Sequence, residues 1–245
     1  MSRPAIISQD QNDLYPTSDQ SNIKIHQAVY TLIDRKQLTT AYKDLTGRFP
    51  VRSAQGHEYV MVAYHYDANC ILGVPVKNRT STELTKAWEH LQSEFARAGE
   101  APEIWVLDNE VSDDLKKAFV TKQTTFQLVP PHSHRRNLAE RAIQTWKNHF
   151  KAGLATADPN FPLIAWNHLI PQANITLNLL RNARANPALS AYAFIYGNFN
   201  FASTPLAPPG TKVIVHLDPK IRGTWELNGD VGWYCGPAMD HYRCV

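Results

Sequence analysis

The sequence predicts an α/β fold in which helices flank a mixed five-stranded sheet, with a small β-rich module at the C-terminus. Three β-rich runs come first, and helical and strand-like patterns alternate after them. This order is expected when parallel strands with crossover helices extend an antiparallel sheet. A proline-rich linker at 205–210 precedes further strand-like runs. We therefore divide the chain into a partly disordered N-terminal arm (1–39), an α/β core (40–204) and a truncated β module (205–245).

The core begins with three runs that are rich in β-branched and aromatic residues, at Thr40–Leu45, His57–Tyr66 and Cys70–Val76. A turn at Thr46–Arg48 ends the first run. The polar segment Asp67–Asn69 separates the second run from the third, which is typical of a hairpin. We expect three consecutive antiparallel strands.

A helix follows, because Thr80 and Glu83 have the spacing of a capping box and an apolar residue recurs every three or four positions. Gly99 and Pro102 end it. The remaining expected elements are a strand at Ile104–Leu107, a helix at Asp113–Val120, a strand at Phe126–Val129, a long helix from about Asn137, a helical stretch at Leu163–Leu180 bent at Pro171, and strands at Thr211–His216, Thr224–Glu226 and Gly232–Tyr234. Trp88, Trp146 and Trp166 have helical spacing and are expected in the core.

The composition excludes few classes of protein. A net charge of +3 permits a nucleic-acid partner without requiring one. Cys70, Cys235 and Cys244 are far apart and lack CxxC spacing, which argues against a disulfide framework or a cysteine zinc site and favours a reducing compartment. No apolar stretch is long enough for a membrane span, so we expect no membrane association.

Three acidic residues occupy places where a metal site could form. Asp44 lies near the end of the first strand, Asp108 follows the fourth, and Glu140 lies in the first turn of the long helix. Converging carboxylates repel one another unless a cation lies between them, and Mg²⁺ prefers such ligands. Singly, each residue has an ordinary structural interpretation as a turn, cap or helix-dipole residue.

The local sequence around these residues resembles a known family. Asp44–Pro50, Leu107–Glu110 and Val129–Arg141 are similar to the integrase region of LTR-retrotransposon polyproteins, within the DDE family of retroviral and retrotransposon integrases. The resemblance extends from about Thr40 to Tyr242. It implies an RNase H-like core that processes DNA 3′ ends and transfers strands, with retroelement ends and target DNA as partners, homo-oligomerisation, and a nuclear location when active or a cytoplasmic one otherwise.

The resemblance also assigns roles to individual residues. Asp44, Asp108 and Glu140 match the three catalytic, metal-binding carboxylates, which implies two Mg²⁺ (or Mn²⁺) ions. Asp67 is a rival for the first position, although the family places its first aspartate before the hairpin. The family's zinc-binding domain has no counterpart upstream of Thr40, where there is no cysteine. A lysine of retroviral members is replaced by Gln144.

Cationic and polar residues surround Glu140. Because lysine and arginine bind DNA phosphates without regard to sequence, we expect DNA contacts from this segment. A solvated helix face is the alternative, and His132 and His134 are further candidates for phosphate contact. The predicted DNA-binding residues are Arg135, Arg136, Arg141, Gln144, Lys147 and Lys151.

These observations support DNA integration by a DDE polynucleotidyl transferase as the first functional hypothesis. A catalytically silent or co-opted integrase-derived protein that binds DNA or another partner is the alternative. An RNase H-type nuclease ranks last, because we find no fourth carboxylate in matching context.

Overall fold

The computed structural model describes residues 39–107, 111–129 and 138–244. The strands are β1 (Thr40–Leu45), β2 (Tyr59–His65), β3 (Cys70–Val76), β4 (Ile104–Leu107), β5 (Thr125–Leu128), β6 (Lys212–His216) and β7 (Gly229–Trp233). The helices are α1 (Ser81–Arg97), α2 (Asp113–Thr121), α3 (Leu138–Ala155), the 3₁₀ helix η3 (Leu163–Leu169), α4 (Ile170–Leu179) and α5 (Ala191–Tyr196).

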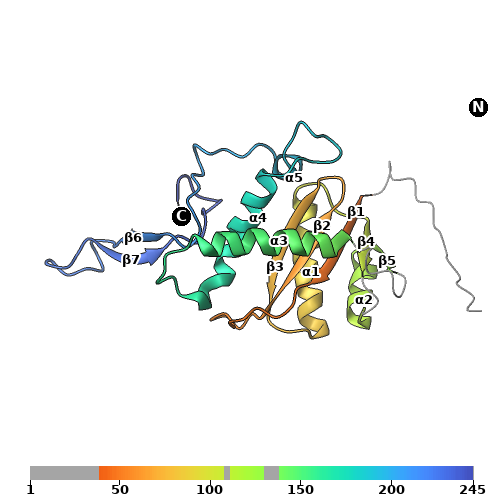
Figure 1. The fold of residues 1–245 in the computed structure, drawn as a ribbon, viewed down its shortest axis with the longest axis horizontal. Coiled ribbons are helices and arrows are strands. Elements are labelled where there is room, and N and C mark those ends of the chain that lie inside the picture. Colours follow the sequence, from red (N-terminus) through yellow and green to blue (C-terminus); the bar gives the residue numbers. More distant parts are fainter. Residues whose placement is uncertain (1–38, 108–110, 130–137, 245) are drawn as a thin grey trace, which may run out of the picture. The chain divides into compact units, whose positions relative to one another are not determined.

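The five core strands form one mixed sheet in the order β3-β2-β1-β4-β5. The first three strands are antiparallel neighbours, whereas β4 pairs parallel with β1 and β5 pairs parallel with β4. Figure 1 shows this sheet with helices packed against it. The predicted RNase H-like α/β architecture is therefore confirmed, and each predicted core strand lies within one or two residues of its expected bounds.

Each face of the sheet has its own hydrophobic core. Ala41 and Leu45 of β1 belong to the core that includes α1 and α2, whereas Tyr42 packs into the core that includes α3 and α4. Side chains of a strand alternate between faces, so β1 contributes to both cores. The prediction that Trp88, Trp146 and Trp166 are core residues is confirmed, since each is at most 2% exposed.

Helix α1 forms where the apolar periodicity predicted it, but the capping box is wrong. Thr80 is the N-cap residue, yet its side chain makes no capping hydrogen bond. Its hydroxyl instead donates to Oδ1 of Asn78, at 2.6 Å. A local bond to an upstream asparagine has replaced the expected bond to the helix.

Helix α3 crosses the face of the sheet opposite α1 (Figure 1). It contacts β1, β2 and β3. Gly73 of β3 permits this close approach, because a Cβ there would lie 2.6 Å from the indole of Trp146. The predicted bend near Pro171 corresponds to the change from η3 to α4, where proline lies in the first turn of α4. Helix α5 was not predicted.

Helix α4 covers the outer edge of the sheet along β3. The side-chain amide of Asn178 accepts from the N–H of Ile71 and donates to its carbonyl, both at 2.8 Å. Asn174 bonds Gly73 in the same way, at 2.8 and 2.9 Å. Two asparagines one helical turn apart thus replace a neighbouring strand. We call this set of four residues the sealed β3 edge.

The C-terminal strands β6 and β7 form a separate two-stranded antiparallel sheet. The predicted strand at Thr224–Glu226 is wrong, because bonds between Gly223 and Glu226 close a turn there. Trp225 in this turn is 99% exposed. Among the residues that the structure describes, no helix has the length and apolar character needed to cross a membrane.

Candidate active site

Asp44 lies on the α3 side of the sheet near the end of β1. It pairs with Val62 of β2, which belongs to the core under α3 and α4, and Tyr42 two residues earlier faces the same core. Oδ1 of Asp44 accepts the backbone N–H of Leu45 at 2.7 Å. This bond holds the half-buried carboxylate at the strand end.

The sheet changes its pairing direction beside Asp44, because β1 is antiparallel to β2 and parallel to β4. The carboxyl ends of β1 and β4 therefore meet at one side of the sheet, at Leu45 and Leu107, which we call the carboxylate edge. Ligands of open α/β sheets bind outside the carboxyl ends of strands at such a switch point. Asp108 follows Leu107 directly and lies outside the described residues.

Glu140 lies in the first turn of α3 and is exposed. Ala139 and Ala142 on either side are buried, and α3 contacts β1. The structure therefore places Glu140 and Asp44 on the same face of the sheet. Among the described residues, Glu140 has no ion-pair partner.

The two described carboxylates fit a magnesium site in donor chemistry, since Mg²⁺ prefers carboxylate and water oxygens. They come from different elements on the same face of the sheet, so their relative position depends on the packing of α3 against β1. Residues 39–107, 111–129 and 138–244 contain no group of three or more histidine, cysteine, aspartate or glutamate side chains arranged to hold a metal. The third predicted ligand, Asp108, is outside these ranges.

The sequence analysis did not single out Lys43, which is a half-buried lysine next to Asp44. It precedes Asp44 and therefore points to the opposite face, the one covered by α1 and α2. Burial lowers the pKa of Lys43 to about 8, and the negative charge of Asp44 opposes this shift. Only its pairing opposite the buried residue Ala63 identifies it as an inward-facing lysine.

The rival aspartate, Asp67, lies in the turn between β2 and β3. Its carbonyl accepts the backbone N–H groups of Arg184 and Ala185 at 2.8 and 2.9 Å. Because His65 at the end of β2 pairs with Ala41 near the start of β1, this turn lies at the opposite end of β1 from Asp44.

The exposed side of α3 displays four of the six predicted DNA-binding residues. They are Arg141, Gln144, Lys147 and Lys151, and all are exposed. The helix buries its other side through Ala142, Trp146 and Phe150. Arg135 and Arg136, and the candidate histidines His132 and His134, lie outside the described residues.

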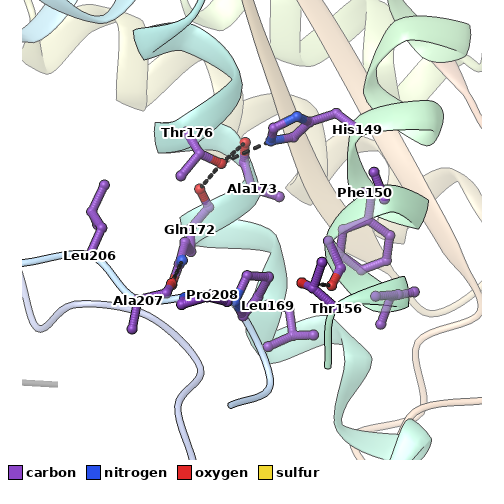
Figure 2. A pocket seen from close by; sticks show the side chains of 14 residues that line it. His149, Phe150, Thr156, Leu169, Gln172, Ala173, Thr176, Leu206, Ala207 and Pro208 are labelled. Carbon is purple, nitrogen blue, oxygen red and sulfur yellow. Dashed lines mark hydrogen bonds between the residues drawn. The ribbon is translucent and has the colours of Figure 1, made fainter. Parts of the chain in front are cut away.

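A cavity of about 380 Å³ lies at the far end of α3 from Glu140, between α3, α4 and the linker that leads to β6 (Figure 2). Its lining is mostly apolar. The ring of His149 hydrogen bonds to the hydroxyl of Thr176 at 2.8 Å, and burial lowers the pKa of His149. Gln172 donates to the carbonyl of Ala207 at 2.5 Å. None of the predicted site residues lines this cavity.

No protein-family model matches the chain, and no curated protein matches it. Solved structures, in contrast, do match the chain. The integrase in a cryoEM structure of the simian T-cell lymphotropic virus intasome, in complex with PP2A regulatory subunit B56 gamma, is 18% identical. The match covers 88% of this chain and 74% of that chain, with a TM-score of 0.53. This chain has the fold of a retroviral integrase core.

Two isolated retroviral cores give similar matches. The HTLV-2 integrase catalytic core domain, solved in complex with magnesium in a trimeric form, is 19% identical; the match covers 64% of this chain and 95% of that chain, with a TM-score of 0.48. The BIV integrase catalytic core domain is 13% identical; the match covers 64% of this chain and 92% of that chain, with a TM-score of 0.46. The intasome match, at 18% identity and a TM-score of 0.53, shows the integrase-like fold alone, so the chemistry of this chain has to be argued from its own residues.

Proposed function

We propose that this chain is the catalytic core of a retrotransposon integrase, a metal-dependent polynucleotidyl transferase that processes DNA 3′ ends and joins them to target DNA. The observation that best supports the proposal is the position of Asp44 and Glu140. Asp44 lies near the end of β1 beside the strand-order switch, and Glu140 lies in the first turn of α3 on the same face of the sheet.

The strand register supports Asp108 as the third ligand. β1 and β4 are parallel, and Tyr42 pairs with Val106. Asp44 and Asp108 each follow this pair by two positions. Carboxylates at equivalent positions of adjacent parallel strands share one face and one edge, so the proposal brings both to the carboxylate edge.

Asp44, Asp108 and Glu140 would hold two Mg²⁺ or Mn²⁺ ions. Metal ions bound there would activate the attacking oxygen and stabilise the leaving oxygen of a phosphodiester. The side chains themselves position the reacting groups: the bond from Leu45 orients Asp44, and the buried side of α3 fixes Glu140 over the sheet. The exposed cations of α3 would bind the phosphates of retroelement and target DNA.

In this proposal the active form is a homo-oligomer located in the nucleus. An oligomer would provide one core for each of the two DNA ends that integration joins. The oligomeric state is tested separately, by the sedimentation of the chain with and without DNA ends, and the location by microscopy of a tagged chain.

The decisive experiment is a strand-transfer assay with short duplexes that end in candidate element sequences, in Mg²⁺ or Mn²⁺. Wild type is compared with Glu140→Gln, which keeps the size of the side chain and removes its charge. Glu103→Gln is the matched control, because Glu103 is exposed beside the N-terminal end of β4, away from the carboxylate edge.

Joined products from wild type and Glu103→Gln, absent with Glu140→Gln, are the expected result. If a folded wild-type chain binds DNA but gives no product with either metal, and Asp108→Asn leaves that binding unchanged, the DNA-binding alternative replaces the proposal. Circular dichroism establishes that each variant is folded.

A further inference from the structure

The connection between β1 and β2 is longer than a hairpin needs. It runs from residue 46 to residue 58, whereas most hairpin loops have about 2–5 residues. Compact surface loops of this greater length, whose ends lie close together, frequently have a functional role. This loop also begins two residues after Asp44, so it extends from the carboxylate edge.

The loop is anchored to η3. The indole of Trp166 donates to the carbonyl of Val51 at 2.9 Å, and Ala54 donates to the carbonyl of Ile164 at 2.8 Å. Phe49 stacks on Trp166, with ring centroids 4.3 Å apart. An anchored loop has little conformational freedom left to lose when it binds a partner.

Bonds within the loop fix its outer half as well. Ser53 is buried, its hydroxyl accepts the backbone N–H of His57 at 2.9 Å, and its own N–H donates to the carbonyl of His57 at 2.9 Å. Asn167 of η3 donates to the side chain of Gln55 at 2.9 Å. The loop carries two arginines, Arg48 and Arg52, and this ordered backbone fixes the positions of their Cα atoms.

Those arginines project into solvent and share one acidic partner. The side chains of Arg48 and Arg52 are 65% and 69% exposed, and they lie 2.7 and 3.9 Å from the carboxylate of Glu58. One carboxylate cannot occupy all the donors of two guanidinium groups, each of which has five N–H bonds. Glu58 holds Arg48 by a hydrogen bond, lies within ion-pair distance of Arg52, and leaves most of their donors available to another partner.

Neighbouring cations extend this positive surface. Lys77 and Arg79 are exposed on the connection between β3 and α1, next to the loop, because Glu58 donates its backbone N–H to Val76. The positive charge of Lys77 adds to burial in lowering the pKa of His57, while Glu83 opposes it. The side of the loop next to β3 is thus electropositive.

We propose that the β1–β2 loop, residues 46–58, is a docking site for the DNA backbone, in which Arg48 and Arg52 bind phosphate groups beside the carboxylate edge. The inference rests on the proposed function for the identity of the partner. It adds a second cationic wall to the one on α3, so that a duplex lying across Asp44 would contact both walls. A planar guanidinium held in place by one carboxylate suits bidentate phosphate recognition.

The test measures DNA affinity of the full chain by fluorescence anisotropy of a labelled duplex, without divalent metal, at several salt concentrations. The variant Arg48→Gln with Arg52→Gln removes both loop charges. Arg97→Gln with Lys122→Gln is the matched control: it removes the same total charge, and Arg97 makes a comparable exposed ion pair with Glu94, at 3.2 Å. Both control residues lie toward the opposite end of the sheet, at the ends of α1 and α2.

We expect the loop variant to weaken binding about 10-fold and to lower the slope of log K against log salt by about two, because two phosphate contacts are lost. The control should stay within about twofold of wild type. Equal weakening in both variants would show a general charge effect and overturn the proposal, as would unchanged affinity in the loop variant or the absence of salt-sensitive binding by wild type.

The affinity measurement needs no catalysis, because it is made without divalent metal. The strand-transfer assay with Glu140→Gln is run alongside it, so the two proposals can fail separately. A chain that transfers no strands but loses affinity on loop substitution would refute the proposed function and keep the docking site. A chain that transfers strands normally with the loop variant, at unchanged affinity, would do the reverse. Thermal unfolding of each variant shows whether the substitutions disturb the fold.

Discussion

Polar side chains have different surroundings at the sealed β3 edge and at the carboxylate edge of the same sheet. At the β3 edge, Asn174 and Asn178 use their amide groups to complete the backbone bonds of a buried strand. At the carboxylate edge, Asp44 is half-buried and Glu140 is exposed. The comparison predicts that substitutions at the first edge change stability, whereas substitutions at the second change chemistry.

The largest expected effect is on catalysis at the carboxylate edge. Asp44→Asn should lower strand transfer about 1,000-fold or more, because metal ligation contributes several kcal/mol to such reactions. Asparagine can still accept the bond from Leu45. We therefore expect the midpoint of thermal unfolding to stay near that of wild type, which differential scanning calorimetry would measure.

Asp240→Asn is a control for this substitution, since Asp240 is exposed near the C-terminus. It should leave both strand transfer and unfolding unchanged. A variant of Asp44 that unfolds readily would show that this carboxylate is a structural group, and the contrast between the two edges would then be wrong.

At the sealed β3 edge the effect should appear as stability. Asn178→Ala leaves the buried N–H and carbonyl of Ile71 without their partner, which we expect to lower the free energy of unfolding by about 2–4 kcal/mol. Asn148→Ala on the exposed side of α3 is the matched change in a helix, and it should have little effect. Urea unfolding measures both.

The same substitution also tests whether the asparagines protect the strand from other chains. An uncovered edge strand is a template for pairing between molecules, so the Asn178→Ala chain should aggregate at lower concentration than wild type. Light scattering reports this. Equal stability of the two alanine variants would mean that the bonds to Ile71 contribute nothing net.

A smaller effect should follow from His65, which is buried at the end of β2 away from the carboxylate edge. Burial lowers its pKa from 6.5 to about 4, and Nδ1 accepts the backbone N–H of Ala68. Because the folded-state pKa lies below the unfolded one, the histidine's contribution to stability is complete above about pH 6.5 and decreases as the pH falls toward 4.

The prediction concerns the slope of the free energy of unfolding against pH, so it holds even if the variant is less stable than wild type at every pH. Between pH 6.5 and 4, the free energy of unfolding should fall less steeply for His65→Gln than for wild type. Urea unfolding across this range gives both slopes. Parallel curves would show that His65 is solvated in the folded chain.

The sequence predicted what periodicity determines and missed what depends on long-range contact. The three β-rich runs and the apolar stripes of α1 and α3 predicted the layers, because burial of one helix face repeats along the chain. Asn174 and Asn178 gave no such signal, since an asparagine in a helix shows no preference for a strand distant in sequence. The local Thr80–Asn78 bond and the turn at Gly223–Glu226 likewise depend on neighbours that spacing alone does not reveal.

The candidate site was predicted from the local sequence around its acidic residues rather than from geometry. The structure puts Asp44 and Glu140 on the same face of the sheet, and their roles stay predictions. Arg48 was placed in a simple turn, because the anchoring of the β1–β2 loop by Trp166 is a contact between segments far apart in sequence. The sequence offered one signal for this loop, which is the length of the segment between the first two β-rich runs.

The smallest effect should come from the C-terminal hairpin, which has neither a buried core face nor a sealed edge. Ile214 and Val231 face each other across β6 and β7, yet they are 70% and 46% exposed. Trp225 is 99% exposed, so Trp225→Ala should change the free energy of unfolding by less than about 0.5 kcal/mol. A loss of several kcal/mol in urea unfolding would show that the indole is covered in solution. The hairpin would then share the packing of the core rather than contrast with it.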